Sequence, residues 1–495
     1  MTRSENSTIA LSLISHTNAG KTTLARTLLG RDVGAVRDEQ HVTQQAASYP
    51  LIETGAGDVL LLWDTPGFGD SARLARRLAQ QHNPVGWFLS QVWDRFRDHA
   101  LFLSQQVVRN VRDSADVVLY LVNAAEAPQD AGYLEPELTI LDWIGKPVIV
   151  VLNQTGRPRP RAEEQHDETR WRNALSDRRI IGAVTTLDAF ARCWVQESAL
   201  FDLVRDAVPQ PKLAAYDRLV DAWLRRRRTQ FDEAIGVLSE PIAAACCDGE
   251  PITDAGIGDA LRDIGRTIGI RRDAADDVKA QASRALAARL DGELRRSTDR
   301  LIALYGIEGR AKGEVVARLA SGVTLDAPVS ERKAAMMGGV VSGALTGLAA
   351  DVAAGGLTFG AGLLTGAVVG ALGGAGIARG MNVARGKSGT TLRWNNPLLS
   401  RLVESALLRY LAVAHYGRGR GDWTETEYPP FWPPLVAEIV DKHRDRLAKL
   451  WTMRQPTCDA DAIDRELRRV LADAATDMLN RLYPGTLALF NARSH

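Results

Sequence analysis

The sequence has little net charge and few cysteines. Its 61 Lys and Arg residues almost balance its 60 Asp and Glu residues, so the formal net charge is only +1. No overall field therefore favours an acidic partner, and we expect no nucleic-acid partner. The four cysteines (Cys193, Cys246, Cys247 and Cys458) include no pair with the spacing of a zinc site. We expect all four to be buried thiols in a reducing compartment.

Other absences narrow the class of protein further. The first ten residues contain no long apolar run, so no secretory signal is visible and we expect the start of the chain in the cytoplasm. No His/Cys cluster suggests a metal-dependent enzyme, and no nucleophile arrangement suggests covalent catalysis. The composition is ordinary, with 45% hydrophobic and 24% charged residues over 495 positions. That length and composition predict two to four folded domains.

A strand, a loop and a helix follow one another near the start of the chain. The apolar stretch 8–15 has the pattern of a buried strand, and "KTTLARTLLG" has apolar residues at helical spacing. The loop between them ends in Gly20, Lys21 and Thr22, the last part of G-x-x-x-x-G-K-[ST], but Ser15 replaces the first glycine. Such a loop wraps phosphates with backbone N–H groups. The candidate phosphate-binding residues are Ser15, Asn18, Ala19, Gly20, Lys21, Thr22 and Thr23.

A second motif follows the stretch "DVLLLW". There Asp64-Thr-Pro-Gly67 has the D-x-x-G spacing of a P-loop switch. We expect Asp64 and the Thr22 hydroxyl to lie near Mg²⁺, and the Gly67 N–H to sense the γ-phosphate. Between the two motifs, Thr43 is the candidate switch threonine that closes on Mg²⁺ and the phosphate.

Two further apolar stretches complete the pattern of an α/β domain. The stretch 116–124 is followed by a predicted helix, and "KPVIVVLNQTG" ends in Asn153-Gln-Thr-Gly156. Alternating strands and helices predict the doubly wound, mostly parallel sheet of a P-loop NTPase. Ligands of such sheets bind at the carboxyl ends of the strands, where the named residues fall.

The ordered set SHTNAGKT, Thr43, DTPG and Asn153 resembles a small GTPase domain. Asn18 in the loop and Phe68 after DTPG make it most similar to the Era-like GTPases. The rest of the chain, including "LDAFARCWVQE" and "AVAHYGRGRGDW", resembles bacterial Era-like GTPases with a large C-terminal domain of unknown function (DUF3482-type). The resemblance implies GTP as ligand, Mg²⁺ as cofactor, and Lys21, Asn18, Thr43 and Gly67 as catalytic residues.

The chain departs from this pattern at the base-binding loop. Related GTPases carry N-K-x-D, whose Asp pairs with guanine, but here Gly156 and Gln154 replace the Asp and the Lys. Asn153 can still brace the loops. The last base-binding loop is expected near 183–190, with Thr186 as the candidate contact and Asp188 as an alternative reader of guanine.

A second departure concerns hydrolysis. Phe68 stands where many GTPases place the glutamine that orients the attacking water, and phenylalanine cannot bond to that water. By resemblance, Asn18 can help to recruit a monovalent cation such as K⁺; the alternative is that Asn18 only stiffens the loop. Either way we expect slow hydrolysis unless self-association or a partner completes the site.

Helical patterns dominate the rest of the chain. The predicted domains are a G domain over 1–209 with a helical insert at 70–115, a helical domain over 210–335, a Gly/Ala-rich hairpin over 336–380, and an α-helical C-terminal region over 381–495. The insert is expected to break at Asn83-Pro84 and to pack its apolar stripe against the C-terminal helices.

Segment 336–380 has glycines at four-residue spacing and basic residues on both flanks. This pattern indicates either a membrane-inserted hairpin, with an inner-membrane lipid or protein as partner, or a glycine-packed hairpin buried in the protein. We therefore predict a GTPase on the cytoplasmic face of the inner membrane that couples nucleotide state to a helical effector domain. The alternatives are a nucleotide-gated scaffold with little turnover, or an ATPase.

Overall fold

The structure is a computed structural model of the whole chain. It describes residues 7–16, 19–30, 46–90, 99–155, 161–188, 193–252, 271–307, 381–386, 389–416, 429–454 and 458–491. The chain divides into two compact units. The first contains Met1–Thr229, His415–Trp423 and Leu482–His495, and the second contains Gln230–Ala414 and Thr424–Arg481.

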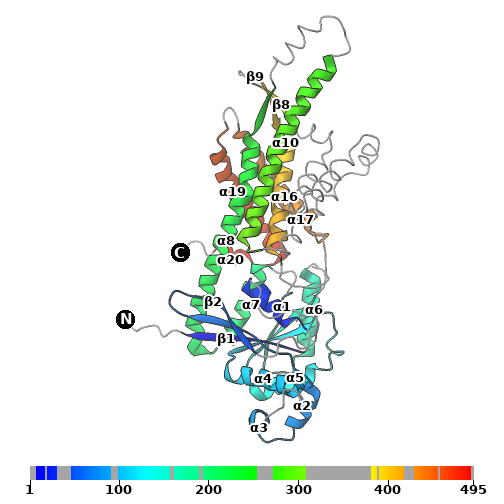
Figure 1. Ribbon diagram of the computed structural model, residues 1–495, viewed down its shortest axis with the longest axis vertical. Helices are drawn as coiled ribbons and strands as arrows, with labels where there is room; N and C mark the ends of the chain where they lie inside the picture. The colour runs from blue at the N-terminus through cyan, green and yellow to red at the C-terminus, as the bar shows by residue number, and fades with distance from the viewer. Residues whose placement is uncertain are drawn as a thin grey trace. The chain divides into compact units, whose positions relative to one another are not determined.

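A six-stranded sheet forms the centre of the first unit (Figure 1). Its strand order is β2-β3-β1-β4-β5-β6, and only β2 runs antiparallel to its neighbour. The central strands β1, β4 and β5 are mostly apolar and are buried along almost their whole length, as a doubly covered parallel sheet requires. The strands are β1 (Thr8–Ser15), β2 (Ala47–Glu53), β3 (Val59–Asp64), β4 (Val117–Asn123), β5 (Val148–Asn153) and β6 (Ile181–Thr186).

Helices cover both faces of this sheet. In Figure 1, α1 and α7 lie above the strands and α4 and α5 lie below them. The predicted doubly wound α/β architecture is therefore confirmed. The helices of this layer are α1 (Lys21–Leu29), α4 (His99–Asp113), α5 (Leu134–Ile144), α6 (Arg161–Ala174) and α7 (Trp194–Ala207).

The helical insert contains α2 (Ser71–Leu78), α3 (Pro84–Ser90) and α4, so the predicted break at Asn83-Pro84 is confirmed. Its apolar residues do not need the C-terminal helices as a packing surface. Phe88 and Leu101 lie fully buried in one core cluster with Leu138 of α5 and residues of β4 and β5. The expectation for this stripe was wrong for the described residues, because helical periodicity shows that a face is buried but does not identify its partner.

A 35-residue helix, α8 (Leu213–Cys247), contributes residues to both units. Two ion pairs fix its beginning to the sheet at the amino ends of the strands. Arg218 donates from Nε and Nη2 to the Asp58 carboxylate, at 2.8 and 3.0 Å. Lys212 Nζ, in the 3₁₀ turn Gln210–Lys212 before α8, contacts both oxygens of Asp116 at 2.9 and 2.8 Å.

Long helices run side by side in the second unit (Figure 1). Pro241 lies inside α8, and a proline has no N–H to donate to the carbonyl four residues earlier. That carbonyl belongs to Val237, and the Ser297 hydroxyl of α10 donates to it at 2.7 Å. The helices of this unit are α10 (Arg271–Leu304), α16 (Asn396–Ala414), α17 (Trp432–Lys442), α18 (Arg444–Thr452) and α19 (Ala460–Leu482), while α20 (Leu487–Asn491) belongs to the first unit.

The second unit also contains a small antiparallel sheet, although the sequence showed no strand signal after about residue 209. Strands β7 (Gly249–Ile252), β8 (Met381–Gly386) and β9 (Gly389–Trp394) pair in the order β7-β9-β8. The region is therefore largely helical, as predicted, with one addition. The strands are four to six residues long, and β7 lies more than a hundred residues before its partner.

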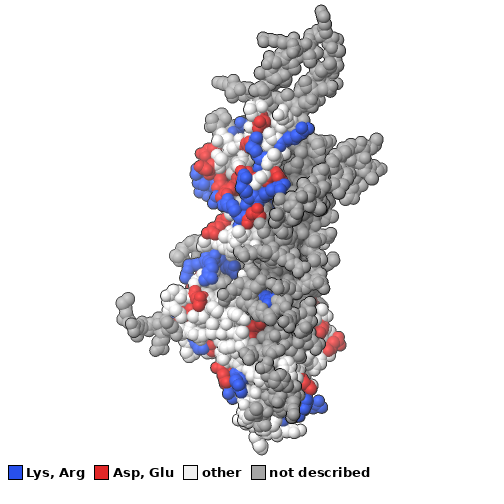
Figure 2. Space-filling model, in the orientation of Figure 1, with Lys and Arg blue, Asp and Glu red and all other residues white. Residues whose placement is uncertain are grey.

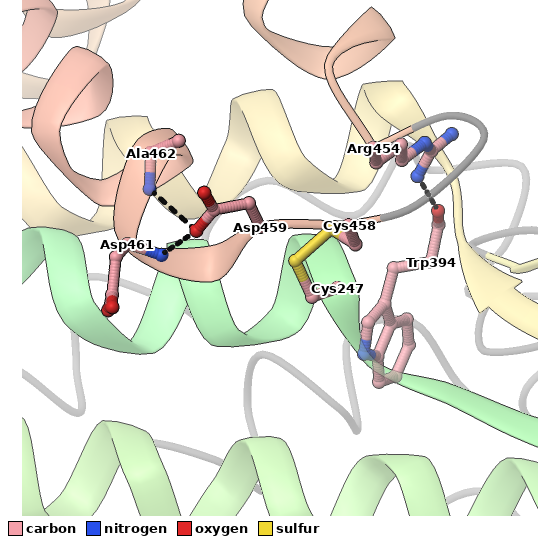
Figure 3. The surroundings of a disulfide bond; sticks show 7 residues. All are labelled: Cys247, Trp394, Arg454, Cys458, Asp459, Asp461 and Ala462. Atoms are coloured by element: carbon pink, nitrogen blue, oxygen red, sulfur yellow. Dashed lines mark hydrogen bonds between the residues drawn. A yellow bond between two sulfur atoms is a disulfide. The ribbon is translucent and has the colours of Figure 1, made fainter.

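One expectation about the cysteines was wrong. Cys247, at the end of α8, forms a disulfide with Cys458, two residues before α19, with their Cα atoms 5.4 Å apart (Figure 3). Cys193 and Cys246 are buried thiols that take part in no disulfide among the described residues, as expected. The two bonded residues lie 211 positions apart, so their spacing in the sequence gave no sign of the bond.

Charges of both signs are mixed on the exposed helices of the second unit (Figure 2). Arg300 pairs with Glu240, and Arg289 pairs with Glu250 at 2.7 Å. Exposed pairs of this kind each contribute about 0–1 kcal/mol. Among the described residues, no helix combines the length and the apolar character needed to cross a membrane. The predicted hairpin at 336–380 lies outside the described residues.

Candidate nucleotide-binding site

Gly20 ends the phosphate loop and caps the amino end of α1. Its φ of +84° lies in the left-handed region that favours glycine. A Cβ at this position would lie 2.6 Å from Asn153 Nδ2. Both the backbone angle and the close contact therefore require glycine here.

Lys21 is buried at the first position of α1. Its Nζ donates to Ser15 Oγ at 2.9 Å. Burial lowers the pKa of the Lys21 ammonium, and the nearby carboxylates of Asp64 and Glu137 partly oppose this shift. The serine that replaces the first glycine thus provides a hydroxyl that holds the lysine over the loop.

Thr22 and Asp64 meet as a magnesium site would require. The Thr22 hydroxyl donates to Asp64 Oδ2 at 2.8 Å. Burial raises the pKa of Asp64, while the bond from Thr22 and the charge of Lys21 oppose the shift. Asp64 Oδ1 is also buried and accepts no hydrogen bond from any residue that the structure describes. A hydroxyl beside an unsatisfied carboxylate oxygen is an oxygen donor set that fits Mg²⁺.

The segment after Asp64 lies against the end of β1, where the phosphate loop begins. The Thr65 hydroxyl donates to the Leu13 carbonyl at 2.6 Å, and the Phe68 N–H donates to the Ser15 carbonyl at 3.1 Å. The Phe68 ring is fully buried in the core, so it is turned away from any attacking water. Gly67 is buried in the same segment.

Helix α4 packs closely on this segment. A Cβ on Gly69 would lie 2.6 Å from the Ala100 Cβ and 2.7 Å from the Ala100 carbonyl oxygen. The Gly69 N–H also donates to the Ser104 hydroxyl, at 3.2 Å. A movement of the segment that follows Asp64 would therefore have to displace α4.

The other end of the site lies where β5 and β6 end. Asn153 Nδ2 donates to the Ala19 carbonyl at 2.9 Å, so the predicted bracing of the phosphate loop is present. Gln154 has a φ of +57°. The Thr186 side chain is buried at the end of β6, and its backbone N–H donates to Glu168 Oε1 at 2.9 Å.

Comparison with known families agrees with this geometry. A family model described as 50S ribosome-binding GTPase matches residues 11–154. A second model, described as a domain of unknown function (DUF3482), matches residues 172–473, which is more than half of the chain. The chain belongs to the DUF3482 family. The predicted combination of a P-loop GTPase domain and a DUF3482-type domain is confirmed.

Solved structures similar to this DUF3482 protein include GTPases. A variant of Aquifex aeolicus Era bound to GDP·AlF4⁻ is 18% identical over 41% of this chain, with a TM-score of 0.30. Era in complex with MgGDPNP and a segment of 16S ribosomal RNA is 16% identical over 42% of this chain, with a TM-score of 0.31. The chain spans 57% and 58% of the length of these two chains.

A third similar structure is the FeoB G-domain from Methanococcus jannaschii. It is 16% identical over 37% of this chain and 85% of its own, with a TM-score of 0.21. No curated protein matches the chain.

The DUF3482 protein has one buried network at this site that sequence reasoning missed. Glu137 of α5 is fully buried, and its carboxylate contacts His16 Nδ1 and accepts from the Tyr120 hydroxyl, both at 2.7 Å. Burial raises the pKa of Glu137, and the hydrogen bond with His16 partly opposes this shift. The sequence feature that could have indicated this network is a glutamate on the apolar face of a predicted helix, between Leu134 and Leu141.

The structure brings together most of the predicted site residues. Ser15, Lys21, Thr22 and Asp64 meet at one end, and Asn153 connects the loop after β5 to Ala19. Thr23 lies in the first turn of α1 beside them. Asn18, Thr43 and Gly156 lie outside the described residues, so their predicted roles stay predictions.

Proposed function

We propose that the protein binds GTP with Mg²⁺ at this site and hydrolyses it slowly. One observation carries the proposal: Lys21 and the Thr22–Asp64 pair lie at the amino end of α1, and the buried Asp64 Oδ1 accepts no hydrogen bond from the described residues. Lys21 would bind the β- and γ-phosphates, and Thr22 and Asp64 would hold Mg²⁺, which neutralises phosphate charge when bound. The backbone N–H groups of the loop would bind the remaining phosphate oxygens.

Slow turnover follows from the residue after Gly67. The buried Phe68 ring cannot orient a water molecule. Hydrolysis would then depend on Asn18 with a monovalent cation, on self-association, or on a partner. Single-turnover rates of GTP cleavage in K⁺ and in Na⁺ test this proposal, and equal, fast rates in both salts would overturn it.

Nucleotide state would reach other parts of the protein through α4. The contacts of Gly69 with Ala100 and Ser104 support this route, because they join the γ-phosphate-sensing segment to a helix. The DUF3482 domain would be the effector. The Gly/Ala-rich segment 336–380 remains the candidate for contact with the inner membrane, and full release of the protein from membranes by a carbonate wash would overturn that part.

The deciding experiment is nucleotide binding by the full-length protein. We expect calorimetry with Mg²⁺ to show that the protein binds GTP more tightly than ATP. We expect Lys21→Ala to abolish GTP binding. Binding of ATP in preference to GTP would indicate an ATPase instead. GTP binding without multiple-turnover phosphate release would favour the nucleotide-gated scaffold. No uptake of either nucleotide by folded protein would overturn the proposal.

A further inference from the structure

We infer that Glu137 is a positioning residue for the phosphate loop and that it acts through His16. This inference rests on the proposed function, since the loop is the proposed site of the GTP phosphates. His16 directly follows Ser15 in that loop. Glu137 lies in α5, 121 positions later in the chain.

The buried carboxylate of Glu137 is costly if it serves packing alone. The side chain is 0% exposed, and taking a carboxylate out of water costs free energy that an apolar side chain would not cost. Leu134, Leu138 and Leu141 already contribute buried apolar side chains to α5. The packing of α5 therefore does not require a glutamate at position 137, and the hydrogen bonds are what this carboxylate adds.

Both oxygens of the carboxylate have partners. Oε1 contacts His16 Nδ1 at 2.7 Å, and Oε2 accepts from the Tyr120 hydroxyl at 2.7 Å. Tyr120 belongs to β4 and pairs in register with Ile14, near the end of β1. Tyr120 therefore orients the carboxylate, and the carboxylate orients His16.

The start of α5 holds the His16 ring through a second contact. The ring stacks on that of Tyr133, with centroids 4.5 Å apart and planes 12° apart. Tyr133 lies immediately before α5, and its hydroxyl donates to Glu126 Oε2 at 3.0 Å. Stacking fixes the plane of the imidazole, and the contact with Glu137 fixes its rotation within that plane.

The placement of His16 matters for the ligand because its backbone belongs to the phosphate loop. His16 forms a parallel bridge with Phe68, in the segment that follows Asp64. At the other end of the loop, Asn153 donates to the Ala19 carbonyl. A loop that is held at both ends loses less conformational entropy when its N–H groups close on phosphates.

The negative charge of Glu137 does not itself favour the ligand, because a carboxylate repels a nearby triphosphate. Burial raises the pKa of Glu137, and the charges of His16 and Lys21 partly oppose this shift. Glu137 therefore contributes to GTP binding through its hydrogen bond with His16. A neutral side chain of the same shape should provide that bond as well.

Glu137→Ala and Glu137→Gln, compared in the full-length protein, test the inference. The alanine variant loses the contact with His16, and we expect it to bind GTP roughly ten-fold more weakly, which corresponds to the ordering of about one loop residue. A glutamine amide can bond to His16 Nδ1 in either tautomer, so Glu137→Gln should keep most of the wild-type affinity. Calorimetry with Mg²⁺ measures both variants. Unchanged affinity of the alanine variant, or equal loss in the two variants, would overturn the inference.

Hydrogen exchange gives a second measurement that needs no nucleotide. We expect the backbone amides of residues 15–21 to exchange faster in Glu137→Ala than in the wild type and in Glu137→Gln, because the loop opens more often. Equal exchange in all three proteins would overturn the inference. Failure of the wild type to bind any nucleotide would overturn the proposed function without changing this result, so the two failures are distinguishable.

Tyr120→Phe is the matched control, because it removes the bond to the other oxygen of Glu137 and leaves the contact with His16. We expect this variant to unfold at lower urea concentration and to bind GTP like the wild type. A loss of GTP affinity as large as that of Glu137→Ala would show that any damage to the buried network weakens binding, and would overturn the inference.

His16→Phe keeps the inference testable if Glu137→Ala does not fold. The His16 side chain is 35% exposed, and phenylalanine retains a ring that can stack on Tyr133 but has no Nδ1. We expect a loss of GTP affinity of roughly ten-fold, with no further loss when Glu137→Gln is added. Wild-type affinity in His16→Phe, or a further loss in the double variant, would overturn the inference.

Discussion

Ser15 stands where the phosphate-loop pattern has its first glycine, and its surroundings show why a side chain is accepted there. Among the described non-glycine residues, only Gln154 has a positive φ, so the Ser15 backbone needs no glycine. The Ser15 hydroxyl accepts a hydrogen bond from Lys21 Nζ. Gly20 differs, because it has both a left-handed backbone and a neighbour in contact range. The glycine that the motif cannot lose is therefore the second one.

Gly20→Ala tests this difference, with Gly30→Ala as its control. Both glycines have positive φ, at +84° and +64°, but a Cβ on Gly30 would meet nothing within 4 Å. We expect Gly20→Ala to weaken GTP binding at least ten-fold, because Asn153 must move. Gly30→Ala should cost about 1 kcal/mol of stability through backbone strain alone and leave binding unchanged. Calorimetry and urea unfolding measure both effects, and equal binding by the two variants would contradict the argument.

The Asp58–Arg218 pair gives a pH prediction. The hydrogen bonds from Arg218 hold the pKa of Asp58 below its usual value of 3.8. The ionised Asp58 therefore stabilises the folded state at pH values above 3.8, and this stabilisation is lost as the pH falls through the lowered pKa. We expect Asp58→Asn to lower the urea midpoint of the full chain by roughly 0.3–0.5 M near pH 6. The two curves should converge on acidification, and a constant gap down to pH 2.5 would contradict the linkage.

An exposed ion pair serves as the control for this experiment. Asp113 accepts from Arg112 Nε at 2.7 Å, and both side chains are 46% exposed. Solvent screens such a pair, so Asp113→Asn should leave the urea midpoint almost unchanged at every pH.

At the scale of single elements, Pro241 shows how a helix tolerates a residue that usually breaks it. The carbonyl that loses its helical donor receives the Ser297 hydroxyl from α10. The carbonyl that proline leaves without a helical donor thus accepts a hydrogen bond from the neighbouring helix. This bond fixes α10 along α8 at that point. The sequence has a helical pattern through this region, but no feature of that pattern identifies Ser297 as the partner.

A double-mutant cycle of Pro241→Ala and Ser297→Ala tests this account. With Pro241 present, Ser297→Ala leaves a buried carbonyl unsatisfied and should cost about 1–3 kcal/mol. With alanine at 241, the helical N–H returns, and the same change should cost clearly less. The contact of Arg409 with the Ser297 hydroxyl is lost in both backgrounds and cancels. Equal costs in urea unfolding of the two backgrounds would contradict the compensation.

Sequence patterns predicted local elements better than their partners. The strand before each motif and the helix of α1 followed from apolar spacing, and the phosphate-loop residues followed from the motif. The insert showed an apolar face, but not that Phe88 would join the same core cluster as Leu138 of α5. The His16–Glu137 contact joins residues 121 positions apart. These partners depend on the packing of the sheet, which single-sequence periodicity does not encode.

At the scale of the whole molecule, the Cys247–Cys458 disulfide closes a loop of about 210 residues within the second unit. Such a crosslink limits the unfolded chain, and its removal should cost about 2–5 kcal/mol. We expect reductant to lower the urea midpoint of the wild type but not that of Cys458→Ser. Cys246→Ser keeps the crosslink and should respond to reductant like the wild type. A wild type insensitive to reductant would contradict the prediction.

The anchoring of α8 by Arg218 and Lys212 has a practical consequence for anyone who wishes to study the nucleotide-binding part alone. An expression fragment that ends at residue 209, where the strand patterns end, would lack Lys212 and Arg218. The carboxylates of Asp58 and Asp116 would then lose their cationic partners. A cut after residue 229 would retain them. Such a fragment would still lack Phe490, whose ring lies 5.6 Å from that of Trp194, so co-expression with a peptide covering 482–491 is the fragment design that this architecture favours.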